Sequence, residues 1–202
     1  MSSAVPDTVP PGPAATPERI LDAATRCIRR WGIRRVSMND VAREAGVSRG
    51  SVYRYFPERD ALVQAVLERN SAQNVAAALP AVRRRRSLAA KVAEAAVFIR
   101  AHVDDELSLG LHGRPEEPEL ATLRLARVES IMTHWIEFWV PFLDEARAQG
   151  EVRADLDLRE AAEWIMRILL SLTTVPSVVV DLDDPEQVRR FVAGHLVRGF
   201  AA

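Results

Sequence analysis

Hydrophobic positions along this chain recur mainly at the three- and four-residue spacing of amphipathic helices. The first such stretch spans Pro17–Trp31, where Thr16 is a suitable N-cap and Gly32 a suitable helix stop. Two shorter helices are predicted over Met38–Ala45 and residues 49–56. Further helices are predicted at residues 58–79, 88–103, 104–111, 119–149, 158–175 and 185–200.

No stretch alternates in the manner of a strand for long enough to form a sheet, so the sequence predicts an all-α protein. Counting the stretches gives about nine or ten helices. Pro141 should kink or interrupt the long helix at residues 119–149. Residues 1–16 contain four prolines among small residues, and we expect a flexible tail there without a signal peptide.

Three short helices, Pro57 and a long fourth helix form an arrangement typical of a helix-turn-helix domain. Gly46 stands where the turn between the crossing helices requires a positive φ, and Ala42 is small where they approach closely. The second helix of such a pair enters the DNA major groove and presents its first residues to base edges. The side chains predicted to be buried between the two helices are Val41, Ala45, Val47, Val52 and Tyr55.

Charge is distributed unevenly, although the net charge is only −1. Residues 1–86 carry 15 basic and 8 acidic side chains, whereas residues 87–202 carry 12 basic and 20 acidic side chains. A basic N-terminal part suits a polyanionic partner such as DNA, although a solvated charged face would give the same pattern. The single cysteine, Cys27, rules out an internal disulfide and favours a cytoplasmic protein, and no apolar run is long enough to span a membrane.

A more specific pattern lies in residues 20–24 (ILDAA), 37–48 (SMNDVAREAGVS) and 51–62 (SVYRYFPERDAL). Together these stretches resemble the tetracycline-repressor (TetR) family of bacterial transcription regulators over about residues 17–67. The resemblance implies a helix-turn-helix DNA-binding domain at residues 17–63 and a helical effector-binding and dimerisation domain at residues 64–202. It also implies the activity of a homodimeric, sequence-specific repressor that a small molecule releases from a double-stranded DNA operator.

The resemblance divides the expected DNA contacts into base contacts and backbone contacts. Asn39 can pair with an adenine edge, and Arg49 and Ser51 lie at the exposed start of the recognition helix. Arg59 stands where the family often has lysine, so the geometry of its phosphate contact need not be the same. Gly50 leaves part of the recognition surface bare. The other expected contacts, at two helix N-termini and along the recognition helix, are Ser37, Ser48, Tyr53, Arg54 and Tyr55.

Aromatic side chains gather at helical spacing in the C-terminal part, where the family has its effector cavity. Such a cavity would suit a small apolar or aromatic effector. Ordinary core packing would explain most of these positions individually. His102 and His134 are the more specific candidates for ligand contact, because a partly buried imidazole needs a polar partner. The candidate pocket residues are Phe98, His102, Leu107, His134, Trp135, Phe138, Trp139, Phe142 and Trp164.

The last two predicted helices carry broad apolar stripes that a homodimer could bury in a four-helix bundle. The alternative is that these stripes only cover the core of one subunit. The candidate interface residues are Ile165, Ile168, Leu172, Val188, Phe191, Val192 and His195.

Three other interpretations stay open at this point. An all-α enzyme could use His102 with Asp104, or His134 with Glu137. The chain has no Glu-x-x-His pair, no Gly-x-Ser-x-Gly motif and no Gly-rich phosphate loop, and we expect no enzyme, metal or cofactor. The same DNA-reading domain would also serve an activator or a DNA binder of low sequence preference. A ligand carrier with a decayed DNA-binding part is the third.

Overall fold

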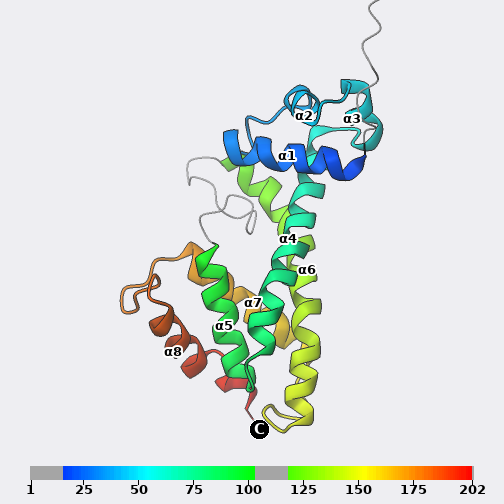
Figure 1. The fold of residues 1–202 in the computed structure, drawn as a ribbon. Helices are drawn as coiled ribbons and strands as arrows, with labels where there is room; N and C mark the ends of the chain where they lie inside the picture. Colours follow the sequence, from blue (N-terminus) through cyan, green and yellow to red (C-terminus); the bar gives the residue numbers. More distant parts are fainter. Residues whose placement is uncertain (1–15, 103–117, 202) are drawn as a thin grey trace, which may run out of the picture. The chain divides into compact units, whose positions relative to one another are not determined.

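The computed structural model describes the backbone of residues 16–102 and 118–201, and the side chains of these residues except 118–131. The described residues form eight α-helices and one short 3-10 turn without a strand, which confirms the all-α class (Figure 1). In chain order these elements are α1 Pro17–Trp31, α2 Met38–Ala45, α3 Arg49–Tyr55, α4 Arg59–Arg83, α5 Leu88–Ala101, α6 Pro118–Ala148, α7 Leu158–Thr174, α8 Pro185–His195 and η1 Arg198–Phe200. The predicted helix at residues 104–111, with Leu107, and the predicted tail before Thr16 lie outside the described residues.

The chain divides into two compact units, the first ending at Val66 and the second beginning at Leu67. The division falls within α4, the helix that also contains the domain boundary proposed from the sequence.

Side-chain caps define where the three helices of the first unit begin. The hydroxyl of Thr16 accepts a hydrogen bond from the Arg19 amide at 3.3 Å, and Ser37 caps α2 in the same way. Ser48 caps α3 by accepting from the Ser51 amide at 3.1 Å. Each cap satisfies an amide that the helix itself leaves unpaired, which is why these three starts could be predicted from the sequence.

The turn between α2 and α3 is built on Gly46, whose φ of 63° is the predicted left-handed conformation. The Val47 amide donates to the Ala42 carbonyl at 3.0 Å and closes α2. Val47 is only half-buried, and the prediction that Tyr55 is buried is wrong, because its side chain is 37% exposed on the outer face of α3. The positions that do bury their side chains between the helices are Val41, Ala42, Ala45 and Val52.

In the second unit, α5 packs against α7 and α8, and α6 packs against α7 (Figure 1). Large side chains of α6 and α7 fill the space between these helices, and each contributes about 1.5–3 kcal/mol when fully buried. The largest of them are Trp135, Trp139, Leu143, Ile165, Met166 and Leu169. Among the described helices, none is both long and apolar enough to cross a membrane.

Pro80 was expected to end one helix, Pro141 was expected to kink or interrupt another, and both prolines lie inside helices. α4 continues past Pro80 to Arg83, and α6 runs through Pro141 to Ala148. Both prolines are exposed, so water can hydrate the carbonyl that each leaves without an N–H donor. The predicted end of the fourth helix at residue 79 is therefore too early, and the helix is not interrupted at Pro141. The predicted helix at residues 185–200 is divided into α8 and η1.

Candidate DNA interface and effector cleft

The candidate recognition helix α3 presents its first turn to solvent. Arg49 and Gly50 are exposed, and Ser51 is half-buried beside Ser48, with 2.9 Å between the two hydroxyl oxygens. Asn39 is exposed on α2. The side chains expected to read bases and the cap expected to meet phosphate therefore all lie on the first unit, and those of Asn39 and Arg49 are exposed.

Two arginines on α3 are held over aromatic rings. The Arg49 guanidinium lies 5.1 Å from the centre of the Tyr53 ring and donates to the Tyr53 hydroxyl at 3.1 Å. The Arg54 guanidinium lies 5.1 Å from the centre of the Tyr55 ring. Cation–π contacts of this kind restrict an exposed arginine without neutralising it. Both cations therefore stay available to a polyanion in a limited set of orientations.

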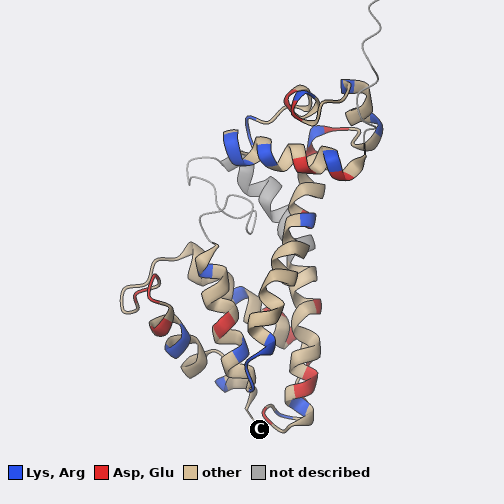
Figure 2. Cartoon of the chain, viewed as in Figure 1, with Lys and Arg blue, Asp and Glu red and all other residues tan. Residues whose placement is uncertain are grey.

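Other arginines of the first unit, whose distribution Figure 2 shows, stabilise the unit itself. Arg26 pairs with Glu44 at 2.6 Å and so links α1 to α2. At the start of α2, the Ser37 hydroxyl donates to Asp40 at 2.5 Å and Arg43 pairs with the same carboxylate at 2.6 Å. These contacts, led by the Ser37 hydrogen bond, lower the pKa of Asp40. Part of the arginine content that suggested DNA binding thus has a structural role.

Arg59 makes contacts that sequence reasoning did not anticipate. Its Nε donates to the Val36 carbonyl at 2.9 Å, an Nη donates to the Ile33 carbonyl, and the other Nη pairs with Asp60 at 3.0 Å. The guanidinium thus joins the start of α4 to the turn between α1 and α2. A lysine has no such rigid fork of donors, so the Arg-for-Lys difference was the one sign of this role in the sequence.

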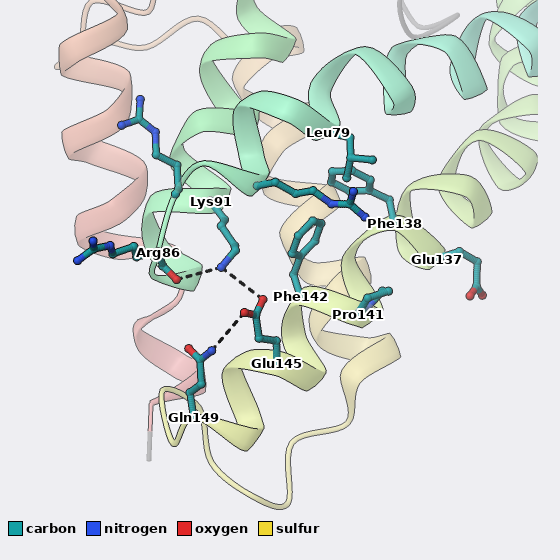
Figure 3. A pocket seen from close by; sticks show the side chains of 11 residues that line it. Leu79, Arg86, Lys91, Glu137, Phe138, Pro141, Phe142, Glu145 and Gln149 are labelled. Carbon is teal, nitrogen blue, oxygen red and sulfur yellow. Dashed lines mark hydrogen bonds and ion pairs between the residues drawn. The ribbon is translucent and has the colours of Figure 1, made fainter.

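A cleft of about 790 Å³ lies in the second unit between the end of α4, the start of α5 and α6 (Figure 3). Its volume falls within the range typical of small-molecule sites. Its walls combine aromatic and charged side chains. The lining residues are Leu79, Arg83, Arg85, Arg86, Lys91, Glu137, Phe138, Pro141, Phe142, Glu145 and Gln149.

Only part of the predicted effector pocket meets this cleft. Phe138 and Phe142 line it. Their neighbours Trp135 and Trp139 are buried in the core, and their indole N–H groups have no hydrogen-bond partner among the described residues. The other predicted pocket residues lie elsewhere: Phe98 stacks on the exposed His102, with 4.2 Å between ring centres, His134 is exposed, Trp164 is 50% exposed on α7, and Leu107 lies outside the described residues.

Lys91 is a charged group of the cleft that sequence reasoning missed. Its side chain is only 7% exposed. The ammonium donates to the Arg86 carbonyl at 2.9 Å, lies 3.5 Å from a Glu145 oxygen, and lies 5.9 Å from the centre of the Phe142 ring. The one indication in the sequence is that Lys91 is the only lysine of an arginine-rich chain.

Beside the cleft, Glu94 connects three segments of the second unit. Arg85 pairs with it at 2.7 Å, and Arg189 of α8 pairs with the same carboxylate at 3.1 Å. Burial acts to raise the pKa of Glu94, but the hydrogen bonds from Arg189 and Arg85 outweigh it and hold the pKa below its usual value. The carboxylate therefore stays ionised and ties α5 to α8.

The candidate dimer residues fall into two groups. Ile165, Leu172, Val188 and Val192 are buried in the core of their own unit, whereas Ile168 and Phe191 are half-buried and His195 is exposed. Large apolar side chains that are exposed on α7 and on the segment after it are Trp164, Val175, Val178 and Val179. The described structure thus leaves an accessible apolar surface on the elements proposed to dimerise.

An N-terminal helix-turn-helix unit joined to an all-helical second unit defines the class of helix-turn-helix transcriptional regulators. Residues 20–66 match the model of the tetR family of bacterial regulatory proteins. The chain is 31% identical over 173 residues to Mb2274c, an uncharacterized HTH-type transcriptional regulator of Mycobacterium bovis, covering 83% of this chain and 85% of the relative. The chain therefore belongs to the TetR family.

Solved structures show the same fold. A TetR-family transcriptional regulator from Rhodococcus has a TM-score of 0.62 at 21% identity, covering 88% of this chain and 94% of that one. The regulator FadR of Bacillus subtilis, solved with stearoyl-CoA, also has a TM-score of 0.62 at 21% identity, covering 91% of this chain and 98% of that one. At this identity the likeness concerns the fold.

Proposed function

We propose that this TetR-family regulator is a homodimeric repressor that leaves a specific DNA operator when a small effector binds its second unit. The observation that carries the proposal is the exposed start of α3, where the side chain of Arg49 is exposed and lies against Tyr53. An arginine in this position can donate two hydrogen bonds to a guanine in the major groove.

The candidate contacts serve two different purposes. Asn39, Arg49 and Ser51 are proposed to read bases, whereas the remaining residues are proposed to hold the phosphate backbone and set the register. Those backbone contacts are Ser37, Ser48, Gly50 through its backbone, Tyr53, Arg54, Tyr55 and Arg59. Because Arg59 already donates hydrogen bonds to two backbone carbonyls, we propose that it contributes less to phosphate binding than an arginine without such contacts would.

The proposed dimer uses one face of α7 and α8 from each subunit. The buried members of the candidate set, such as Ile165 and Val188, hold these helices on their own core. The accessible members, Ile168, Phe191 and His195, are then left for the partner, together with Trp164. An isologous contact of this kind matches the two-fold symmetry of a palindromic operator.

Effector control is supported by the cleft, whose volume and mixed aromatic and charged walls suit a small ligand. An effector releases DNA only if it binds the conformation without DNA more tightly. A coupling free energy of about 1–3 kcal/mol would lower operator affinity about 5- to 150-fold. In FadR of Bacillus subtilis the bound molecule is stearoyl-CoA, which is an apolar chain with an anionic head.

Selection of DNA sites from a random duplex library tests the proposal. The full chain should enrich a two-fold symmetric motif whose half-sites are separated by about one helical turn or a multiple of it. The Arg49→Ala variant, selected in parallel, should lose preference at one position of each half-site. Enrichment of no motif, or of a single unpaired half-site, would refute sequence-specific reading by a dimer.

A further inference from the structure

The cleft of the second unit has an apolar floor and a cationic end. Leu79, Phe138, Pro141 and Phe142 supply the apolar and aromatic surface. The cations that line it are Arg83, Arg85, Arg86 and Lys91, against the carboxylates Glu137 and Glu145. Which of these charges are available to a ligand depends on their partners within the chain.

Two of the four cations, Arg85 and Arg86, are not available to a ligand in the cleft. Arg85 pairs with Glu94 at 2.7 Å. Arg86 provides its carbonyl to Lys91, while its side chain is directed away from Phe142 (Figure 3). Arg83 has no ion pair with any residue in the described part of the chain. The available cations are therefore Arg83, at the end of α4, and Lys91, on α5.

The neighbour of Lys91 is a carboxylate at the mouth of the cleft. Glu145 is 50% exposed, and its distance of 3.5 Å from the ammonium is longer than the 2.7–2.9 Å of a well-formed ionic hydrogen bond. Gln149 donates to the other Glu145 oxygen at 3.2 Å and holds the carboxylate toward solvent. Glu137, in contrast, pairs with Arg159 and points away from Lys91 (Figure 3).

A buried ammonium that is weakly paired and stands beside aromatic rings can accept a better anion. We propose that the cleft binds an amphipathic anion, whose carboxylate or phosphate head contacts Lys91 and Arg83 and whose apolar body lies on Phe138 and Phe142. Glu145 occupies the head-group position in the free protein and swings into solvent when the ligand arrives. This inference rests on the proposed function, because it names the chemical class of the effector.

Calorimetric titration of the full chain with dodecanoate and dodecyl phosphate, below their micellar concentrations, tests the proposal. Dodecan-1-ol and dodecyltrimethylammonium carry the same chain with a neutral or a cationic head and serve as controls. We expect both anions to bind at least 10-fold more tightly than either control. A difference between the two anions would distinguish a carboxylate ligand from a phosphate ligand. Equal or tighter binding of a control would overturn the proposal.

Variants of the cleft test the position of the head group. Lys91→Met should weaken dodecanoate binding about 10- to 100-fold, and Lys91→Arg should restore part of it. Glu145→Gln removes the competing carboxylate and should tighten binding several-fold. Asp155→Asn changes the net charge by the same amount at an exposed position between α6 and α7 that does not line the cleft, so it is the matched control and should leave binding within about twofold.

The variants at exposed carboxylates still test the proposal if Lys91→Met unfolds. Because Glu145 and Asp155 are exposed, their variants are expected to fold even if Lys91→Met does not. Equal affinity of the Glu145→Gln and Asp155→Asn variants would place the head group elsewhere and refute the proposal.

Operator binding measured with and without dodecanoate separates this inference from the proposed function. Dodecanoate that binds but does not change operator affinity would contradict effector control by this cleft. Release of the operator by the neutral or cationic amphiphile alone would leave effector control standing and refute an anionic effector.

Discussion

Removing the guanidinium of Arg59 should destabilise the first unit more than it affects DNA attraction. Arg59→Ala deletes two hydrogen bonds to the carbonyls of Val36 and Ile33, in the turn between α1 and α2. A hydrogen bond to a charged group contributes about 1.5–3 kcal/mol, but this side chain is 32% exposed and water replaces part of the loss. We therefore expect a destabilisation of about 1–3 kcal/mol in total.

Native-state hydrogen exchange of the α1 and α2 amides, together with urea unfolding, measures this loss where it occurs. Arg59→Lys should recover less than half of it, because an ammonium cannot reach both carbonyls as the guanidinium fork does. Arg54→Ala is the control, since it removes another arginine of the same unit but no contact with this turn. It should change stability by less than about 0.5 kcal/mol.

DNA binding by the Arg59→Ala variant gives a second, independent readout. A pure phosphate contact would change the slope of log affinity against log salt by about one and leave stability unchanged. Unchanged hydrogen exchange together with such a change in slope would refute the stabilising role of Arg59.

Three further predictions address the other parts of the molecule. Arg49→Ala should weaken operator binding by about 1–3 kcal/mol and relax base preference. An equal loss of affinity for all DNA sequences would show that Arg49 contacts phosphate and does not read a base. Trp164→Glu should give monomers in sedimentation experiments with greatly weakened operator affinity, and intact dimers would remove α7 from the interface. Glu94 has a lowered pKa, so its pairing stabilises the fold above the ordinary glutamate pKa of about 4.5 and loses this effect as the pH falls. The Glu94→Gln variant should therefore be less stable than the wild type near neutral pH. If the difference in their free energies of unfolding did not become smaller as the pH falls, the stabilising role of the Glu94 carboxylate would be contradicted.

Local signals in the sequence were sufficient to predict the first unit. Thr16, Ser37 and Ser48 each offer an oxygen to the first free amides of a helix, and Gly46 alone accepts the left-handed turn without strain. The predicted bounds of α1 and α2 therefore agree with the structure to the residue. Tyr55 was misjudged because its burial depends on which face of the short α3 its ring occupies.

Features that depend on tertiary surroundings could not be predicted in this way. Pro80 and Pro141 are tolerated because each lies on an exposed face, which spacing alone does not reveal. The burial of Lys91 arises from α6 packing beside α5, and the contacts of Arg59 link residues far apart in the sequence. For the same reason, aromatic spacing predicted Phe138 and Phe142 in the cleft but not the cations beside them.

The measurement that tests the central claim most directly is a titration of the selected operator with the full chain, against a scrambled duplex and over a range of salt concentrations. We predict saturation at two chains per operator and an affinity at least about 1000-fold above that for the scrambled duplex. Addition of dodecanoate should then release the protein from the operator. Binding of both duplexes with equal affinity, or saturation at one chain per operator, would contradict a dimeric sequence-specific regulator.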